Sequence, residues 1–490
     1  MTAAGAGASL AEPDGVLIGG TWSEGEREPL EVTSPADESV VARIAQASPA
    51  QGERAVREAA AAQRGWARLS YLERATHLLA IADRLEAGAD EAAATITLEM
   101  GKPKAQALGE VGFAVAILRY TAEWARRIQG EIVPSDEPGE VIQLLRVPIG
   151  VVLAILPWNF PLALFARKAA PALLTGNTVV VKPSELTPMT GLYMARVAEE
   201  AGLPAGVLNL TVGDRALGDA LVRSPEVGMV TLTGSTRAGK QVMAAAAENL
   251  TRVSLELGGK APSIVWSDSD LELAVESIVG ARHLNSGQVC TCAERVFVHD
   301  DVYEDFVSAY AARVEQLVVG DPAGEVDLGP IVSSDQLEKI EAAVEDAIDG
   351  GATAVVAPAR PSGAEFMRGN WITPGVFTDL DQSAKLLREE TFGPITPIVR
   401  VDSLEQVLAL ANDSRYALAA YLYSNDFRLI TELSQHLECG ELYVNRSIGE
   451  ALQAHHSGHK ESGIGGEDGL HGVLKYTQIR SVYQRYRDGV

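Results

Sequence analysis

The chain has 490 residues, of which 47% are hydrophobic and 22% charged, and its formal net charge is −25 because 66 acidic residues face 41 Lys and Arg residues. This length and composition are typical of a globular protein with two or three domains and a large core. So acidic a surface repels phosphate backbones and anionic membranes, which argues against nucleic acid or a membrane as a partner.

The amino terminus and the cysteines indicate the cellular compartment in which the protein is expected. The first residues, MTAAGAGASLAEPDG, lack a basic start and an apolar run, so we expect a flexible tail over residues 1–15 and no signal peptide. No run of eighteen uncharged apolar residues predicts a transmembrane span. The three cysteines, Cys290, Cys292 and Cys439, form no spread-out disulfide framework. We therefore expect a soluble, cytoplasmic protein.

The first half of the chain passes from helical patterns to alternating strands and helices. After a strand-like start, GVLIGGTW, the apolar spacing of residues 49–127 is typical of amphipathic helices, and a polar segment with Pro134 and Pro138 ends that pattern. From Gly150 on, helical patterns separate the short apolar runs GVVLAILP, TVVVKPS, GVLNLTVG, VGMVTLTGS and RVSLELGG. This alternation predicts a parallel sheet covered on both faces, with ligands at the carboxyl ends of its strands.

A second alternating region begins at PSIVW. It continues through the apolar runs RVFVH, TAVVAP, FGPITPIVRV, LAAYLYS and GELYVN. We expect these runs to form a second α/β domain. No tandem repeat or coiled-coil heptad is apparent.

Cys290 lies in GQVCTCAERVFV, between a glycine-containing loop and a predicted strand. A lone free cysteine is more often a small buried hydrophobe than a nucleophile. The Cys-x-Cys pair also suggests zinc, but no second pair follows at finger-like spacing. By composition the histidine cluster over residues 455–459 is a better metal candidate, but such a cluster alone more often forms a polar loop or a substrate contact. We expect no metal site.

Other polar residues follow predicted strands. Glu256 ends the strand in LELGG, where a carboxylate is either paired structurally or held for proton transfer. Asn159 lies between two prolines in PWNFP, as a turn former or an oxyanion donor. Lys182 and Glu185 follow the strand in VVVKPSE, where they either lie on a solvated turn or bind ribose hydroxyls.

The segment GSTRAGKQ, residues 234–241, matches most of a P-loop and raises a nucleotide hydrolase as an alternative of another class. Gln241 stands where the magnesium-binding Ser or Thr belongs, so we expect a phosphate site at a helix N-terminus without P-loop metal chemistry. The glycine-rich GIGGEDG, residues 463–469, has the wrong spacing for a dinucleotide fingerprint and is predicted to be a loop.

Six motifs in order make the chain, from about residue 15 to its end, resemble the aldehyde dehydrogenase superfamily: PWNFP, KPSE, TGSTxxG, LELGGK, GQVC and EETFGP. AEWARRIQGEI, NSGQVCTCAERV and ESGIGGEDGLHG resemble its lactaldehyde/glycolaldehyde dehydrogenase branch. The resemblance implies an α/β fold: a Rossmann-like NAD-binding domain (16–128 and 149–258), an α/β catalytic domain (259–474) and a small β oligomerisation element (129–148 and 475–490). It also implies a homodimer or homotetramer.

The resemblance implies roles for individual residues. Cys290 matches the nucleophile, with Cys292 as its neighbour, Glu256 matches the general base, and Asn159 matches the oxyanion donor. Residues matching the cofactor site are Pro157, Trp158, Lys182, Glu185, Gly234, Ser235, Leu257, Glu390 and Phe392. Glu185 favours NAD over NADP, because a carboxylate repels a 2′-phosphate. A silent relative that binds NAD without thiol chemistry is disfavoured by the intact catalytic set.

The resemblance also suggests a substrate class. Glu450 and His456 match substrate-facing residues, together with Asn159 and Thr291, and such polar partners suit a small hydroxyaldehyde. Members that transfer the acyl group to coenzyme A generally lack the glutamate, so Glu256 favours a free acid product. Thr291 and the pair Ile448–Gly449 depart from close relatives. Succinate semialdehyde therefore stays open as a substrate, with an arginine expected at the pocket from among Arg167, Arg282 and Arg446.

Overall fold

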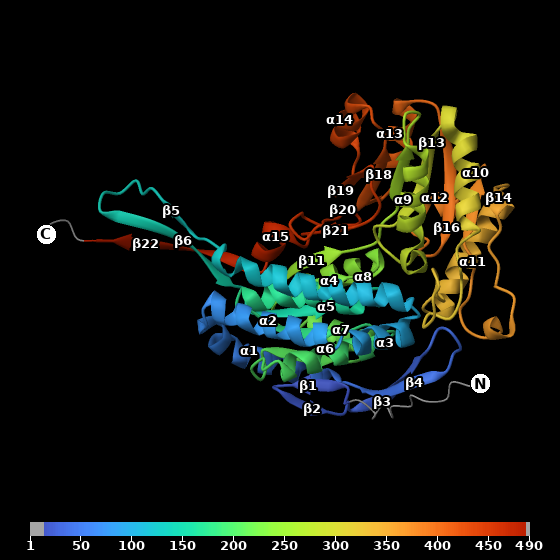
Figure 1. Ribbon diagram of the computed structural model, residues 1–490. Helices are drawn as coiled ribbons and strands as arrows, with labels where there is room; N and C mark the ends of the chain where they lie inside the picture. The colour runs from blue at the N-terminus through green and yellow to red at the C-terminus, as the bar shows by residue number, and fades with distance from the viewer. Residues whose placement is uncertain (1–13, 487–490) are drawn as a thin grey trace.

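The computed structural model describes residues 14–486, so nearly all of the expected N-terminal tail lies outside the described part. Figure 1 shows two α/β lobes side by side and a β arm that projects from one of them. The first lobe holds the N-terminal helices, and the second holds the strands of the C-terminal half. No helix of the described residues is long and apolar enough to cross a membrane.

The first lobe is built on an eight-stranded sheet in the order β2-β1-β9-β8-β7-β10-β11-β21. The five central strands, from β9 to β11, pair in parallel, which confirms the parallel sheet predicted from the alternating pattern. Its strands are β1 (Val16–Ile18), β2 (Thr21–Ser23), β7 (Val151–Ile155), β8 (Thr178–Lys182), β9 (Leu208–Thr211), β10 (Val227–Thr233), β11 (Arg252–Glu256) and β21 (Gly463–Ile464).

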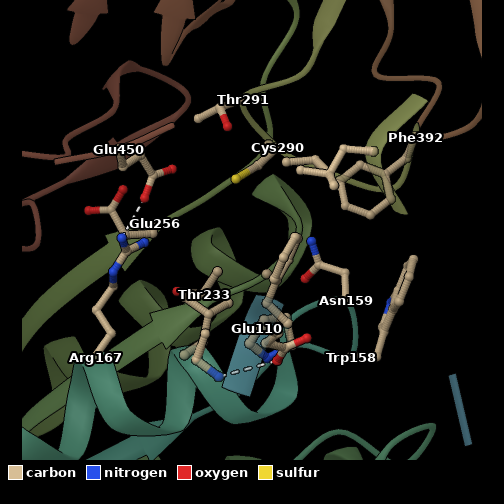
Figure 2. A pocket seen from close by; sticks show the side chains of 18 of the residues that line it. Glu110, Trp158, Asn159, Arg167, Thr233, Glu256, Cys290, Thr291, Phe392 and Glu450 are labelled. Carbon is tan, nitrogen blue, oxygen red and sulfur yellow. Dashed lines mark hydrogen bonds and ion pairs between the residues drawn. The ribbon is translucent and has the colours of Figure 1, made fainter. Parts of the chain in front are cut away.

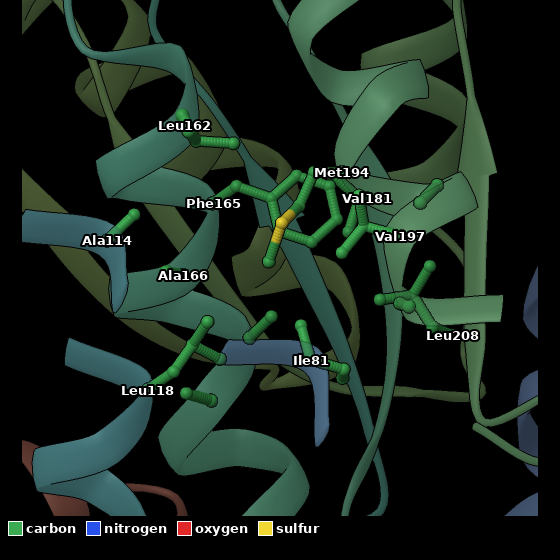
Figure 3. Packing of buried hydrophobic residues seen from close by; sticks show 14 of the residues in the cluster. Ile81, Ala114, Leu118, Leu162, Phe165, Ala166, Val181, Met194, Val197 and Leu208 are labelled. Atoms are coloured by element: carbon green, nitrogen blue, oxygen red, sulfur yellow. The ribbon is translucent and has the colours of Figure 1, made fainter. Parts of the chain in front are cut away.

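Helices pack on this sheet through apolar faces. The segment expected to be helical forms α1 (Pro49–Arg68), α2 (Tyr71–Ala87), α3 (Ala89–Met100) and α4 (Lys104–Glu123), and the sheet connections are α5 (Pro161–Leu174), α6 (Pro188–Glu200), α7 (Arg215–Val222) and α8 (Thr236–Ala246). Ser48 and Ser70 start α1 and α2 with capping boxes. In the core, Phe165 of α5 packs with Met194 of α6 and Val181 of β8 (Figure 3).

The second lobe contains a seven-stranded sheet in the order β14-β15-β16-β13-β12-β18-β19, parallel except for β14. The predicted second α/β region is therefore confirmed. Its strands are β12 (Ala261–Val265), β13 (Ala293–His299), β14 (Thr353–Val356), β15 (Gly375–Thr378), β16 (Ile395–Val401), β18 (Ala419–Tyr423) and β19 (Glu441–Val444). Its helices are α9 (Leu271–His283), α10 (Tyr303–Val314), α11 (Ser334–Asp349), α12 (Lys385–Arg388), α13 (Leu404–Asn412) and α14 (Phe427–His436).

The arm is a three-stranded antiparallel sheet of β5 (Glu131–Val133), β6 (Glu140–Pro148) and β22 (Thr477–Arg485). β6 pairs with β22 from Pro148 opposite Thr477 to Glu140 opposite Arg485. These are the two segments expected to form the oligomerisation element. The arm exposes large apolar side chains, namely Ile132, Leu145, Ile479 and Tyr483.

Three strand pairs were not predicted from the sequence. They are the hairpin of β3 (Arg27–Thr33) and β4 (Val40–Gln46), the pair of β17 (Tyr416–Ala417) and β20 (His459–Lys460), and β21 beside β11. The prediction that residues 463–469 form a loop is wrong for Gly463 and Ile464, which pair with Glu256 and Leu255. Two paired residues are too few to leave an alternating pattern. The short helix α15 (Gly469–Leu474) follows.

Candidate active site

A cavity of about 480 Å³ lies where strand ends and loops of the two lobes meet (Figure 2). Of the predicted site residues, only Lys182 and Glu185 do not line it. The predicted residues that do are Pro157, Trp158, Asn159, Gly234, Ser235, Glu256, Leu257, Cys290, Thr291, Glu390, Phe392, Glu450 and His456. The structure thus brings together side chains that are up to about 300 residues apart in the sequence, at the edge where parallel strands end.

Cys290 lies in the loop between a short 3-10 helix, η3 (Leu284–Gly287), and β13. Asn285, Ser286 and Gly287 have φ of 53°, 56° and 77°, a left-handed run that turns the chain sharply. The Ser286 hydroxyl donates to Gly329 O at 2.9 Å and secures the turn. Figure 2 shows the Cys290 sulfur pointing into the cavity, with Glu256 to one side and Asn159 to the other.

The two neighbouring thiols have different surroundings. Burial, and then the nearby carboxylates of Glu450, Glu390 and Glu256, raise the pKa of Cys290 well above its usual value. Its thiol is therefore protonated at neutral pH until a base removes the proton. Cys292 is fully buried outside the cavity lining, where its sulfur accepts a hydrogen bond from Arg282 at 2.8 Å. This placement makes Cys290 the thiol that a ligand can reach.

Glu256 ends β11 with 3% of its surface exposed, and neither carboxylate oxygen has a hydrogen-bond partner among the described residues. Burial raises its pKa to about 7, an effect that the charge of His456 opposes. Leaving a buried carboxylate unpaired is unfavourable for folding. No hydrogen bond holds this carboxylate, although Nε2 of His456 is 3.7 Å away, and its pKa suits proton transfer near neutral pH.

Asn159 follows β7 in the turn between Pro157 and Pro161. Its side-chain nitrogen donates to Gln288 O at 3.0 Å, which leaves one amide hydrogen for a ligand. A buried ion pair holds the turn, because Lys102 donates to Asn159 O at 2.8 Å and also pairs with Glu110. Glu110 in turn accepts hydrogen bonds from the first backbone N–H groups of α5. Neither Lys102 nor Glu110 was predicted from the sequence.

A network of buried ion pairs forms the wall behind Glu256. Arg167 of α5 pairs with Glu450 and, at 2.8 Å, with Asp468. Burial alone would raise the pKa of Glu450, but Arg167 and His456 lower it to about 2. Glu467 pairs with Lys168 at 2.8 Å and with Lys475 at 3.1 Å. Of the three candidate arginines, only Arg167 lines the cavity, and both of its acidic partners already neutralise it.

His456 lies among carboxylates at the same wall. Its Nδ1 is 3.0 Å from Glu441 and 3.7 Å from Glu450, and its Nε2 is 3.7 Å from Glu256. Burial opposes the charge of the ring, but Glu450, Glu441 and Glu256 raise its pKa to about 10. Glu441, Glu450 and His456 bring ligand atoms within 4.8 Å of one another, as a metal site would. Because Glu441 already holds the ring and Arg167 holds Glu450, we interpret this group as an ion-pair network.

The opposite end of the cavity suits a dinucleotide. Helix α8 begins there at Ser235, whose hydroxyl accepts the Ala238 N–H at 3.2 Å, so that a positive helix end faces the cavity beside Gly234. The rings of Trp158 and Phe392 meet edge to face at 5.3 Å next to Glu390. A phosphate-binding helix end, flat rings and a carboxylate for ribose hydroxyls form the donor set that such a cofactor requires.

Lys182 and Glu185 lie at the carboxyl end of β8, outside the lining of this cavity. Lys182 is buried, and its Nζ is 3.1 Å from a Glu185 oxygen. The lysine of the P-loop-like segment, Lys240, is 62% exposed and pairs with Glu461 at 2.7 Å. A P-loop lysine must reach the phosphates, so this pairing argues against the nucleotide hydrolase.

Comparison with known proteins shows agreement over nearly the whole chain. The family model described as "Aldehyde dehydrogenase family" matches residues 22–482. The chain is 43% identical to lactaldehyde dehydrogenase of Escherichia coli (strain K12), over 93% of this chain and 95% of that protein. It is 40% identical to mitochondrial succinate-semialdehyde dehydrogenase of Arabidopsis thaliana, over 95% and 88%. A structure of 3,6-anhydro-L-galactose dehydrogenase in complex with NAP is similar, with a TM-score of 0.94, 42% identity and coverage of 96% and 99%.

Proposed function

The chain belongs to the aldehyde dehydrogenase family, whose members use NAD(P), and from this premise we propose that it oxidises a small hydroxyaldehyde to the free acid with NAD. One observation carries the proposal. The same cavity is lined by the Cys290 thiol, the Asn159 amide and the Glu256 carboxylate, which accepts no hydrogen bond from the described residues. Together they provide a nucleophile, an oxyanion donor and a base.

These side chains account for acyl transfer in two stages. Cys290 attacks the aldehyde carbon and gives its proton to Glu256, and the new alkoxide is stabilised by the Asn159 amide and the Cys290 backbone N–H. NAD(P), when bound, would supply the acceptor for the hydride that this adduct loses. Glu256 releases this first proton to solvent and can then take a proton from the water that attacks the resulting thioester on Cys290. The acid leaves, and the proton taken from this water passes from Glu256 to the sulfur and restores the thiol.

The charge of the substrate pocket favours a hydroxyaldehyde over a semialdehyde. The guanidinium of Arg167 is already neutralised by Glu450 and Asp468, so a substrate carboxylate at this wall would meet like charge. A hydroxyl group can instead donate to Glu450, and Thr291 has a buried hydroxyl oxygen without a partner among the described residues. The similarity to lactaldehyde dehydrogenase supports the same choice, whereas the similarity to the succinate-semialdehyde enzyme supports the alternative.

The preference for NAD rests on the pair at the end of β8. Lys182, the cation that would attract a 2′-phosphate, is paired with Glu185. A phosphate at this position would face the carboxylate and displace the ion pair. We therefore infer that NAD is used in preference to NADP.

A panel of aldehydes tests the proposal. Glycolaldehyde, L-lactaldehyde, succinate semialdehyde and acetaldehyde are each assayed with NAD and with NADP, and kcat/KM is measured from the absorbance of the reduced cofactor. We expect the hydroxyaldehydes with NAD to give the highest values. Cys290→Ala should abolish turnover and Cys292→Ala should retain it. No turnover with any of these substrates would refute the proposal, and a preference for succinate semialdehyde would select the alternative substrate class.

A further inference from the structure

The buried side chain of His456 lies between the proposed base, Glu256, and Glu441, a carboxylate on the other sheet. His456 is 4% exposed, and its backbone forms two hydrogen bonds with the backbone of Glu467, at 3.0 and 2.6 Å. Its ring nitrogens face opposite ways, with Nδ1 3.0 Å from Glu441, the first residue of β19, and Nε2 3.7 Å from Glu256, the last residue of β11. Backbone and ring are thus both held, and the ring cannot turn without losing a contact.

This geometry favours a charged ring. A neutral imidazole carries one N–H and can satisfy only one of the two carboxylates, whereas an imidazolium carries an N–H on each side. Glu450 adds a third carboxylate, 3.7 Å from Nδ1. A neutral ring would leave its unprotonated nitrogen facing a carboxylate in a buried site, which is unfavourable.

The other charged groups around Glu256 are already committed to partners. The groups that face this wall come from α5, the Cys290 loop, β19, the loop after β19 and the α15 region, and they are Arg167, Lys168, Cys290, Glu441, Glu450, Glu467, Asp468 and Lys475. Lys168 and Lys475 both pair with Glu467, and Arg167 pairs with Glu450 and Asp468. Of the cations at this wall, His456 is the one whose free N–H faces Glu256.

We propose that His456 is a positioning residue for the base: as an imidazolium anchored by Glu441, it keeps the Glu256 carboxylate ionised between turnovers. The proposal deepens the function proposed above and rests on Glu256 being its base. It adds Glu441, which lies outside the cavity lining, to the residues on which catalysis depends. It also separates two tasks of His456, because facing the substrate affects KM and keeping the base ionised affects the pH dependence of kcat.

The kinetic test compares pH profiles of kcat at saturating aldehyde and NAD for the wild type, His456→Gln and His455→Gln. An opposite charge within 4–6 Å lowers the pKa of a carboxylic acid by about 1–3 units, so its removal by His456→Gln should move the acid limb about one pH unit upward. His455 is the matched control, because it is adjacent and half-buried but lies against His471 outside the cavity lining. An acid limb that stays in place in His456→Gln overturns the proposal.

A second test needs no turnover. The His456 ring is followed by NMR of protein labelled with [13Cε1]-histidine, with the His456→Gln spectrum identifying its signal. In the wild type the ring should remain protonated beyond pH 8. Glu441→Gln and Glu256→Gln should each lower the midpoint of its titration by about one unit, because coupling between two charges is reciprocal. A midpoint that is the same in Glu256→Gln and in the wild type overturns the proposal, whatever substrate the enzyme uses.

Discussion

At the scale of single residues, the central feature is a base without a hydrogen bond beside a thiol that is protonated in the resting enzyme. Burial raises the pKa of both groups, and that of Glu256 reaches about 7, so its carboxylate can take up a proton near neutral pH. Glu256 serves both chemical stages, because it takes a proton from the thiol and later from water. A substitution at this residue should therefore slow both stages.

We predict that Glu256→Gln slows both the formation of reduced cofactor and the turnover. Glutamine has the same shape and cannot accept a proton, so neither the Cys290 thiol nor the attacking water loses its proton readily. Loss of a general base typically lowers the rate by about 10²–10⁴, and kcat should fall by this amount. Stopped-flow absorbance should show no burst of reduced cofactor, and mass spectrometry of the quenched enzyme should show no accumulated acyl group. Asn159→Ala should also slow the formation of reduced cofactor, because it removes a donor to the alkoxide. Multiple turnovers at the wild-type rate in Glu256→Gln would contradict the prediction.

We also predict that Glu450→Gln changes substrate preference. The substitution removes one of the two charges that neutralise Arg167, so the guanidinium can pair with a substrate carboxylate. The ratio of kcat/KM for succinate semialdehyde to that for glycolaldehyde should rise about tenfold, as a gain of about 1.4 kcal/mol in one charged contact implies. Arg446→Gln is the control, because this arginine contacts Gly449 O and does not line the cavity. An unchanged ratio in Glu450→Gln would show that Arg167 is not available to substrates.

Sequence reasoning located the residues that stand in a local motif at the end of a strand or just before one, and the structure brings these residues together. Cys290, Glu256 and Asn159 each stand in such a motif, although their catalytic roles remain predictions. Glu441 was not found, because it is a lone charge on a strand and its partner is 15 residues away on another segment. Arg167 is one of three candidate arginines in the sequence, but the sequence does not show which of them reaches the cavity, because its partner Glu450 is 283 residues away. Pairing over such distances depends on how the sheets pack, and no local pattern records it.

At the scale of elements, the loop before Cys290 depends on backbone conformations that few residues adopt. Gly287 has φ of 77°, and a Cβ atom at this position would lie 2.5 Å from the Gly393 backbone. The loop is thereby pressed against the segment that carries Glu390 and Phe392, so the thiol and the residues expected at the nicotinamide are held by one contact. The β15 strand and the β3–β4 hairpin were missed for a different reason, because short or half-exposed strands leave no strong alternation.

We predict that Gly287→Ala lowers both activity and stability. A left-handed conformation is unfavourable for alanine by about 1–2 kcal/mol, and the steric clash with Gly393 adds to this. The melting temperature should fall, and kcat should fall with it as Cys290 moves. Gly112→Ala is the matched control, because this glycine lies inside α4 and outside the cavity lining, with no atom within 4 Å of an added Cβ, and alanine there should stabilise by about 0.5–1 kcal/mol. Equal melting temperatures for the two variants would contradict the argument.

At the scale of the whole molecule, the projecting arm is the feature that a single chain does not explain. β5, β6 and β22 form a narrow sheet without helices to cover it, and its apolar side chains are exposed. A three-stranded sheet of this kind gains stability when a second surface covers it. That the arm joins chains into dimers or tetramers stays a prediction.

We predict that Ile479→Ser weakens assembly. Ile479 lies on β22 and is 55% exposed, so the substitution removes apolar surface without disturbing the core of the chain. Light scattering after size exclusion should show a smaller assembly, or dissociation at a higher protein concentration than in the wild type. Phe427→Ser is the control, because this residue is 79% exposed on α14, in the other lobe. If both variants keep the wild-type mass at every concentration, the arm is not the interface.

His456 lines the cavity and also faces Glu256, and this double contact restricts how such an enzyme can be re-engineered. Thr291, Ile448 and Gly449 also line the cavity, but none of them carries a charge that reaches the base. A mutational library at these three positions can therefore search for new aldehydes at a constant pH optimum. A library at position 456 changes substrate choice and pH optimum together, so selection at a single pH would discard variants whose only defect is a displaced optimum. Screening that position at two pH values recovers them.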